Sequence, residues 1–164
     1  MKEEKLWNSN YIKVWLANFM IFFSFMLVTP LLPIYLSETF AADKHVIGVV
    51  LSGYTLTALL VRPFSGFIVD SYPRKQVLLI CFFLMFIFFA GYLVAGSLLL
   101  FAIVRTLHGA PFGATTVANS TVAIDVLHPS RRAEGIGYYG LSNNIATAIS
   151  PSVSIYLYQL THNF

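Results

Sequence analysis

The turn that decides the fold of this chain has the sequence GFIVDSYPRK at residues 66–75. A long apolar run ends there at Asp70, and after a short turn Arg74 and Lys75 precede a second long apolar run. Charges that separate two apolar runs, each long enough to cross a bilayer, are typical of a hairpin of membrane helices. We therefore interpret this turn as the rim of a membrane-spanning hairpin.

The composition of the whole chain excludes a soluble globular domain. Of its 164 residues, 57% are hydrophobic and 10% are charged, whereas soluble domains carry about 25% charged residues. The net charge is +3, but the bases lie in short clusters between apolar runs, so we expect no nucleic-acid partner. The single cysteine, Cys81, excludes an internal disulfide, and we expect it to pack among apolar neighbours.

Five apolar runs of about 20 residues predict an all-α fold, a polytopic membrane protein with five transmembrane helices. The predicted helices span about residues 14–35, 47–69, 77–94, 98–124 and 136–160. No segment alternates with a period of two, as barrel strands do. The first run exceeds the about 7–15 residues of a signal-peptide core, so we expect it to be a retained helix.

The basic residues predict the orientation of these helices. Of the ten Lys and Arg, Lys44 lies alone on one side of the predicted membrane, and Arg62 and Arg105 lie inside apolar runs. The other side holds Lys2, Lys5, Lys13, Arg74, Lys75, Arg131 and Arg132. Because cytoplasmic loops carry an excess of bases, we expect a cytoplasmic N-terminus.

The charged turn resembles the loop between helices two and three of the major facilitator superfamily, a family of secondary transporters. The family pattern is Gly, three residues, Asp, a base, any residue, Gly and two bases. Ser71 and Pro73 depart from this pattern. The residues that fit it are Gly66, Asp70, Arg74 and Lys75.

The resemblance implies that this turn is a conformational charge relay. In the family, the loop latches two helical bundles together in the outward-open state, partly through an acid near the inner end of helix four. Asp125 is placed to be that acid, so Asp70, Arg74 and Asp125 form the candidate relay, assisted by Gly66 and Lys75. The alternative is a solvated ion pair that only sets topology.

Arg105 is the second candidate, because it lies inside an apolar run, roughly 10 Å below the outer surface at 1.5 Å per residue. An intramembrane charge is a functional hypothesis by default, and the alternative is snorkelling to the headgroups. Arg105 and Gly109, four residues later, resemble a second family motif that implies a role in proton transfer or in contacts with helix one. His108 shares the face of Arg105 and is a candidate for proton coupling, or for a cross-helix hydrogen bond.

Further polar and small residues complete the candidate site. Asn18, Tyr54 and Asn119 are candidates to line a cavity, although each is more readily explained as an interhelical hydrogen bond. Ser150 and Pro151 resemble a degraded form of the family's antiporter motif, which implies a bend in helix five. Small residues at 109, 110, 113, 114 and 118 predict a close-packing face on helix four.

The resemblance implies that residues 1–164 form a truncated N-terminal bundle of a twelve-helix carrier in the inner (plasma) membrane. Its expected partners are the lipid bilayer, a small-molecule substrate, protons and the missing C-terminal half, without which we expect no transport. No phosphate-binding Gly-Lys-Ser loop and no metal-ligand spacing occur in the sequence, so we expect no cofactor, no metal and no enzymatic activity.

The predicted function is proton-coupled efflux of small organic molecules such as drugs or sugars, by alternating access. One alternative is a proton-coupled solute importer or a facilitator. An alternative of another class is a membrane scaffold subunit that transports nothing.

Overall fold

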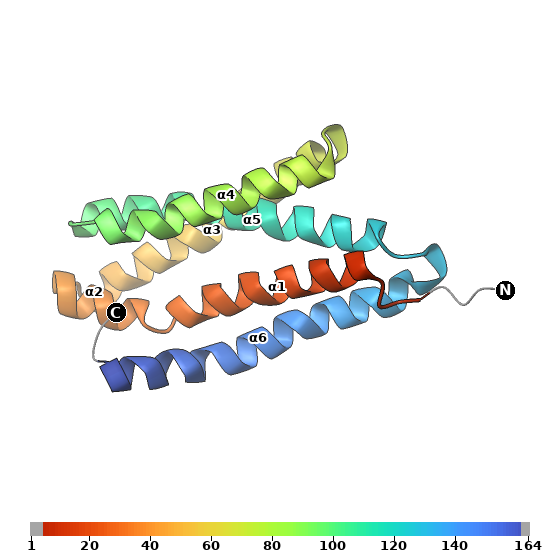
Figure 1. Cartoon of the computed structure of the whole chain (residues 1–164). Coiled ribbons are helices and arrows are strands. Elements are labelled where there is room, and N and C mark those ends of the chain that lie inside the picture. Colours follow the sequence, from red (N-terminus) through yellow and green to blue (C-terminus); the bar gives the residue numbers. More distant parts are fainter. Residues whose placement is uncertain (1–4, 162–164) are drawn as a thin grey trace. The chain divides into compact units, whose positions relative to one another are not determined.

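A computed structural model describes residues 5–161 of the chain (Figure 1). Lys2, one of the bases that predict the orientation, lies outside this range. Every regular element of the described range is a helix. The α-helices are α1 (Ser9–Val28), α2 (Leu32–Phe40), α3 (Lys44–Ser71), α4 (Arg74–Gly91), α5 (Leu98–Asp125) and α6 (Arg132–Thr161). Two 3₁₀ helices, η1 (Tyr92–Val94) and η2 (Pro129–Arg131), lie in the connections.

Four helical segments of the described chain are long and apolar enough to cross a membrane. They are Ser9–Phe40, which contains α1 and α2, followed by Lys44–Ser71, Arg74–Val94 and Leu98–Asp125. The 30 residues of α6 also suffice in length, but Ser142, Asn143 and Asn144 make this helix more polar. The predicted all-α membrane fold is therefore confirmed, and the crossing by α6 remains a prediction.

Polar caps make the first and third helices begin earlier than their apolar runs. The side chain of Asn8 accepts hydrogen bonds from the backbone N–H groups of Asn10 and Tyr11, so α1 begins at Ser9. Asp43 accepts from the N–H of Val46 at 2.9 Å, which caps α3. Side-chain caps of this kind satisfy donors that have no partner inside the helix.

The first predicted helix is divided into two, with α1 ending at Val28 and α2 beginning at Leu32. The break contains Pro30, which has no backbone N–H to donate into a helix and whose ring clashes with the preceding turn. The second part continues to Phe40, beyond the predicted end at residue 35.

Among the described residues, Ala41 is the non-glycine residue with a positive φ, which is 49°. Its backbone strain can be tested by measuring stability. Ala41 lies in the turn between α2 and α3, where the N–H of Ala42 donates to the carbonyl of Leu36 at 3.2 Å. A left-handed alanine costs about 1–2 kcal/mol, although glycine also gains freedom in the unfolded chain. We expect Ala41→Gly to raise the free energy of unfolding by about 0.5–1 kcal/mol, measured by denaturant titration in detergent.

The control for this prediction is Ala42→Gly. Ala42 is not among the described residues with positive φ, so glycine there only adds freedom to the unfolded chain and should lower stability. Equal effects of the two substitutions would contradict the explanation by backbone strain.

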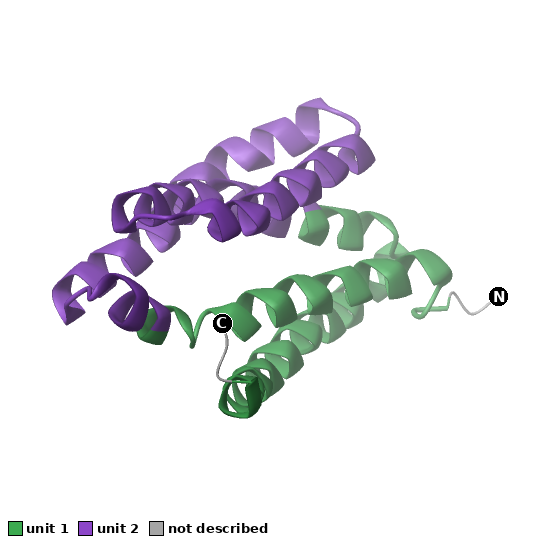
Figure 2. Cartoon of the chain, turned by 60° about the vertical axis from the view of Figure 1, so that its left-hand side comes forward, with its two compact units in different colours: residues 1–34, 119–164 green, residues 35–118 purple. Residues whose placement is uncertain are grey.

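The chain forms two compact units, which Figure 2 colours separately. Unit 1 contains residues up to 34 and from 119 onward, and unit 2 contains residues 35–118. Within unit 1, α1 and α6 lie side by side (Figure 1). The Tyr11 hydroxyl donates to the carbonyl of Gly135 at 2.5 Å, and the Ser154 hydroxyl donates to the carbonyl of Leu27. Polar bonds thus join these two helices near both ends.

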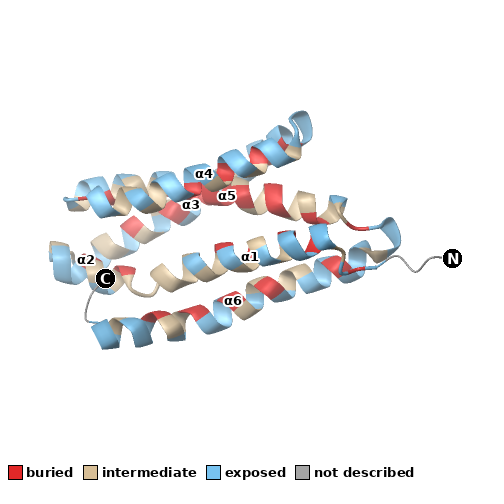
Figure 3. Cartoon of the chain, in the orientation of Figure 1, coloured by how far each residue is buried: buried red, intermediate tan, exposed pale blue. Residues whose placement is uncertain are grey.

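Unit 2 contains most of α2, all of α3, α4 and η1, and the first three-quarters of α5. Val77, Cys81 and Met85 form the buried stripe of α4, and most of its remaining surface is exposed (Figure 3). Cys81 packs in a cluster with Val69 and Ala118. An apolar helix that buries only one stripe is suited to contact with lipid on its other faces.

Candidate functional site

Arg105 lies in the interior of unit 2, in α5, with only 3% of its surface exposed. Its guanidinium carbon lies over the ring of Tyr54 on α3, 4.1 Å from the ring centroid. Its Nη1 donates to the hydroxyl of Tyr92 at 3.3 Å. The structure therefore shows a buried cation held by two tyrosines, and the snorkelling alternative does not describe this conformation.

Tyr92 connects Arg105 to His108. Its hydroxyl lies 2.9 Å from Nδ1 of His108, which is fully buried. Because this hydroxyl accepts from Arg105, its own proton is available to Nδ1 of a neutral His108, whose proton is then on Nε2. Nε2 has no hydrogen-bond partner among the described residues. The ring of Phe89 packs against the imidazole at a centroid distance of 4.8 Å.

The turn between α4 and α5 explains why these side chains meet. In an antiparallel helical hairpin, residues equally distant from the middle of the turn lie opposite each other. The pairs Tyr92–Arg105 and Phe89–His108 share one midpoint, between residues 98 and 99 where α5 begins, so the same register brings both pairs together. The candidate residues from the sequence did not include Tyr92.

The chemistry of this cluster follows from its burial. Placing an Arg at the centre of a membrane helix costs about 2.5–3.5 kcal/mol on insertion scales. A cation–π contact removed from water returns about 2 kcal/mol or more. A buried charge acts strongly on an anionic or carbonyl group that approaches it, because the local dielectric constant is low.

An ion pair joins the two sides of the charged turn at the end of α3. Nη2 of Arg74 lies 3.6 Å from Oδ1 of Asp70, and the side chains are 39% and 73% exposed. Asp70 lies in the last turn of α3 and Arg74 is the first residue of α4. Acids favour helix N-termini and bases favour C-termini, so both charges oppose the dipole of their own helix. An exposed pair contributes only about 0–1 kcal/mol, so local stability does not explain this arrangement.

Two other residues of the predicted relay lie in the same turn. Lys75 is exposed in the first turn of α4. A Cβ added to Gly66 would meet no described atom within 4 Å. Gly66 is therefore not a point of close helix packing within unit 2.

Asp125, the third predicted member of the relay, is the last residue of α5 and is exposed. It belongs to unit 1, whereas Asp70 and Arg74 belong to unit 2. The structure describes each unit by itself, so the three-residue relay remains a prediction.

Asn18 and Asn119 are buried within unit 1 and form hydrogen bonds between helices. Nδ2 of Asn18 donates to the hydroxyl of Ser142 at 2.8 Å, and Nδ2 of Asn119 donates to that of Tyr139 at 2.9 Å. Both side-chain carbonyls lack a partner among the described residues. These contacts match the interhelical hydrogen bonds that are the alternative explanation for both residues. That their side-chain carbonyls line a cavity remains a prediction.

Ser150 and Pro151 lie in the interior of α6, which continues through both of them. The hydroxyl of Ser150 donates to the carbonyl of Ala146 at 2.5 Å. Pro151 leaves the carbonyl four residues earlier without its helical donor, which is the usual cause of a bend. The role of this segment as a hinge remains a prediction.

No group of three or more His, Cys, Asp or Glu side chains in residues 5–161 could hold a metal ion. The candidate site therefore consists of the aromatic cluster around Arg105 and the charged turn around Asp70.

Comparison with known proteins gives consistent matches along the chain. The family model described as Major Facilitator Superfamily matches residues 14–162. Quinolone resistance protein NorA of Staphylococcus aureus (strain MRSA252) is 21% identical over 155 residues, which cover 94% of this chain and 40% of that protein. The uncharacterized MFS-type transporter YqjV of Bacillus subtilis (strain 168) is 25% identical over 127 residues, which cover 77% and 31%. The chain thus spans less than half the length of these relatives.

Proposed function

Since the chain belongs to the major facilitator superfamily, we propose that it supplies the N-terminal helical bundle of a secondary active transporter for small organic molecules. It is a multi-pass membrane protein, and the family indicates a transporter rather than an enzyme. The proposed N-terminus is cytoplasmic, as the distribution of the bases predicts. The remainder of such a carrier is the partner with which this bundle would alternate between two open states.

The observation that carries this proposal is the burial of Arg105 against Tyr54, in the interior of a helix suited to a membrane. Intramembrane charges are rare because they are costly, and they mark pathways of substrates and ions. A membrane scaffold needs no such group, because apolar residues would pack the same helices at lower cost. The cluster therefore favours transport over the scaffold alternative.

We propose that the charged turn holds the two halves of the carrier together in one of its states. Asp70 and Arg74 both oppose their helix dipoles, and residues that break local rules often serve function. In this proposal, the carboxylate of Asp125 forms an ion pair with Arg74 when the latch is closed. The pair within the turn is exposed and therefore open to exchange of partners.

Asp70→Asn is expected to reduce transport by at least about tenfold while the protein still inserts in the membrane. The amide has almost the same shape but cannot form the ion pair with Arg74, so the latched state loses stability relative to the other states. Transport rate and protein amount in membranes are measured together. The matched control is Glu134→Gln, because Glu134 is also an exposed acid paired with an Arg, at 2.6 Å from Arg131. Transport at the wild-type rate by Asp70→Asn would show that Asp70 only sets the topology of the helices.

The proposed direction is proton-coupled efflux, supported by the likeness to a protein named for quinolone resistance. Accumulation of a fluorescent quinolone is compared in cells with and without the full-length protein, before and after a protonophore. Lower accumulation that rises with the protonophore is the expected result. Higher accumulation with the protein would instead identify an importer, and no difference for a series of organic solutes would contradict the transporter proposal.

A further inference from the structure

Unit 2 has an apolar groove that the proposed transport mechanism does not use. It lies between α3, α4 and α5 and has a volume of about 580 Å³. Small-molecule sites have volumes of about 300–1,000 Å³. The groove is therefore large enough for a ligand, and its lining identifies which kind.

The lining combines exposed faces of the helices with the buried residues Val77, Cys81 and Pro111 at its base. On α4 it follows one helical face through Gln76, Ile80, Leu84 and Phe88, which recur at intervals of four residues. Ile80 is 58% exposed, and Leu107 on α5 is 51% exposed.

Small side chains on α5 make the groove hollow. Ala110, Pro111 and Ala114 line it on this helix, and none of them reaches far from the backbone. The walls are Ile68 and Val61 of α3 and the face of α4 already described. The result is a trough between two longer ridges of apolar side chains.

The length of the groove matches one leaflet of a membrane. From Gln76 to Phe88 it follows α4 for about 18 Å at 1.5 Å per residue. One leaflet contributes about 15 Å, half of the hydrocarbon core of about 30 Å. All three helices are long and apolar enough to cross a membrane, and in a membrane the exposed lining would contact hydrocarbon chains.

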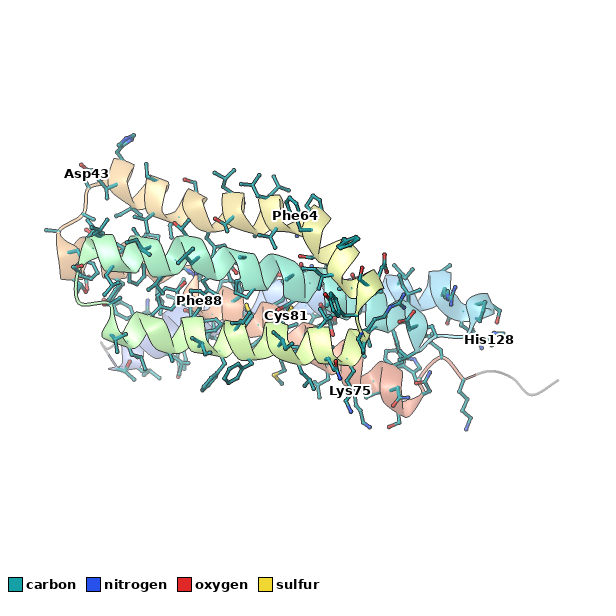
Figure 4. The ribbon with its side chains drawn as sticks, turned by 90° about the horizontal axis from the view of Figure 1, so that it is seen from above. Asp43, Phe64, Lys75, Cys81, Phe88 and His128 are labelled. Atoms are coloured by element: carbon teal, nitrogen blue, oxygen red, sulfur yellow. The ribbon has the colours of Figure 1, made fainter. Side chains whose placement is uncertain are left out.

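One end of the groove differs from the rest. Tyr72 and Gln76, the polar lining residues, are both at the end where α4 begins, and the exposed Lys75 precedes Gln76. Figure 4 shows Lys75, Cys81 and Phe88 in this order along α4. The other end, at Phe88 and Leu107, is apolar. A cation with hydrogen-bonding side chains at one end and a long apolar trough match a phosphate headgroup and an acyl chain.

We propose that this groove binds an anionic phospholipid, with one acyl chain along α4 and the phosphate near Lys75. Tyr72, which is 63% exposed, lies at the headgroup level, where aromatic side chains are enriched. The proposal needs the membrane location of unit 2 and does not depend on the proposed transport function.

The test uses phosphatidylglycerol with a photoreactive diazirine in one acyl chain. The protein is reconstituted in phosphatidylcholine vesicles with a trace of this lipid and irradiated, and labelled peptides are mapped by mass spectrometry. We expect labels on residues 76–88 and 107–114, displaced by excess unlabelled phosphatidylglycerol more effectively than by phosphatidylcholine.

Two variants separate the headgroup from the chain. Lys75→Gln should remove the preference for the anionic lipid while labelling of the groove persists. Ile80→Trp should fill the trough and reduce labelling by either lipid. The matched controls are Lys44→Gln and Leu79→Trp. Lys44 is the first residue of α3, at the opposite end of that helix, and Leu79 is 59% exposed on α4 but lies outside the groove.

Two outcomes would overturn the proposal. Equal labelling of all exposed apolar faces would show that the groove has no preference for lipid. A benzophenone amino acid at position 80 that crosslinks to protein in place of lipid would show that another helix or a second copy fills the groove.

Discussion

Arg105→Gln is expected to abolish transport by the full-length protein, with a loss of well over about tenfold, while insertion and helical content are retained. The substitution removes the buried charge and the cation–π contact with Tyr54. It also removes the donor that holds the Tyr92 hydroxyl, so the hydrogen bond from Tyr92 to His108 loses its fixed direction. The measurement is transport rate per amount of protein in the membrane, with circular dichroism of the purified protein.

Arg105→Lys distinguishes charge from geometry. Lysine keeps the positive charge but lacks the planar guanidinium that stacks on Tyr54 and donates to Tyr92 at the same time. We expect it to restore less than half of the activity. Full activity with Lys would show that charge alone is needed, and the aromatic contacts would then be packing.

Arg62→Gln is the matched control, because Arg62 also lies inside an apolar run but is exposed on α3. A long basic side chain can reach the headgroups from such a place, so its loss should change transport little. If Arg62→Gln and Arg105→Gln impaired transport equally, the effect would come from membrane insertion and not from the buried cluster.

The sequence was sufficient to predict that the chain is helical and lies in a membrane, because long apolar runs leave few alternatives. It was less informative about where helices end. Asn8 and Asp43 extend α1 and α3 through side-chain hydrogen bonds, and a count of apolar residues omits such caps. Pro30 was visible in the sequence, yet whether a proline kinks or divides a helix depends on its surroundings.

The candidate site was predictable only in part. The charge of Arg105 within an apolar run identified that residue, because a charge there needs an explanation. Tyr92 has no such mark, since tyrosine near the end of an apolar run is ordinary at a membrane interface. Gly66 fits the family pattern, but packing decides whether a glycine is approached, and no described atom lies within 4 Å of a Cβ placed there. The apolar groove between α3, α4 and α5 depends on the relative sizes of side chains on three helices, which no local pattern reveals.

Gly109→Ala is expected to destabilise unit 2 by about 1–3 kcal/mol, the range for overpacking. A Cβ at this position would lie 2.1 Å from the carbonyl oxygen of Tyr54, which is backbone and cannot rotate away. At Gly113 a Cβ would lie 2.4 Å from the carbonyl oxygen of Ala58. The two glycines are four residues apart and face the same helix, α3, which is the small-residue packing that brings membrane helices close together.

The double substitution tests this explanation, because both clashes are relieved by one movement of α3 away from α5. Once the helices have separated for Gly109→Ala, Gly113→Ala has less left to disturb, so the combined cost should be smaller than the sum of the single costs. Gly48→Ala on α3 is the control. A Cβ there meets no described atom within 4 Å, and alanine in a helix interior should stabilise by about 0.5–1 kcal/mol. Denaturant unfolding in detergent measures all four variants. Equal stability of Gly109→Ala and Gly48→Ala would contradict close contact between α3 and α5, and with it the position of Tyr54 beneath Arg105.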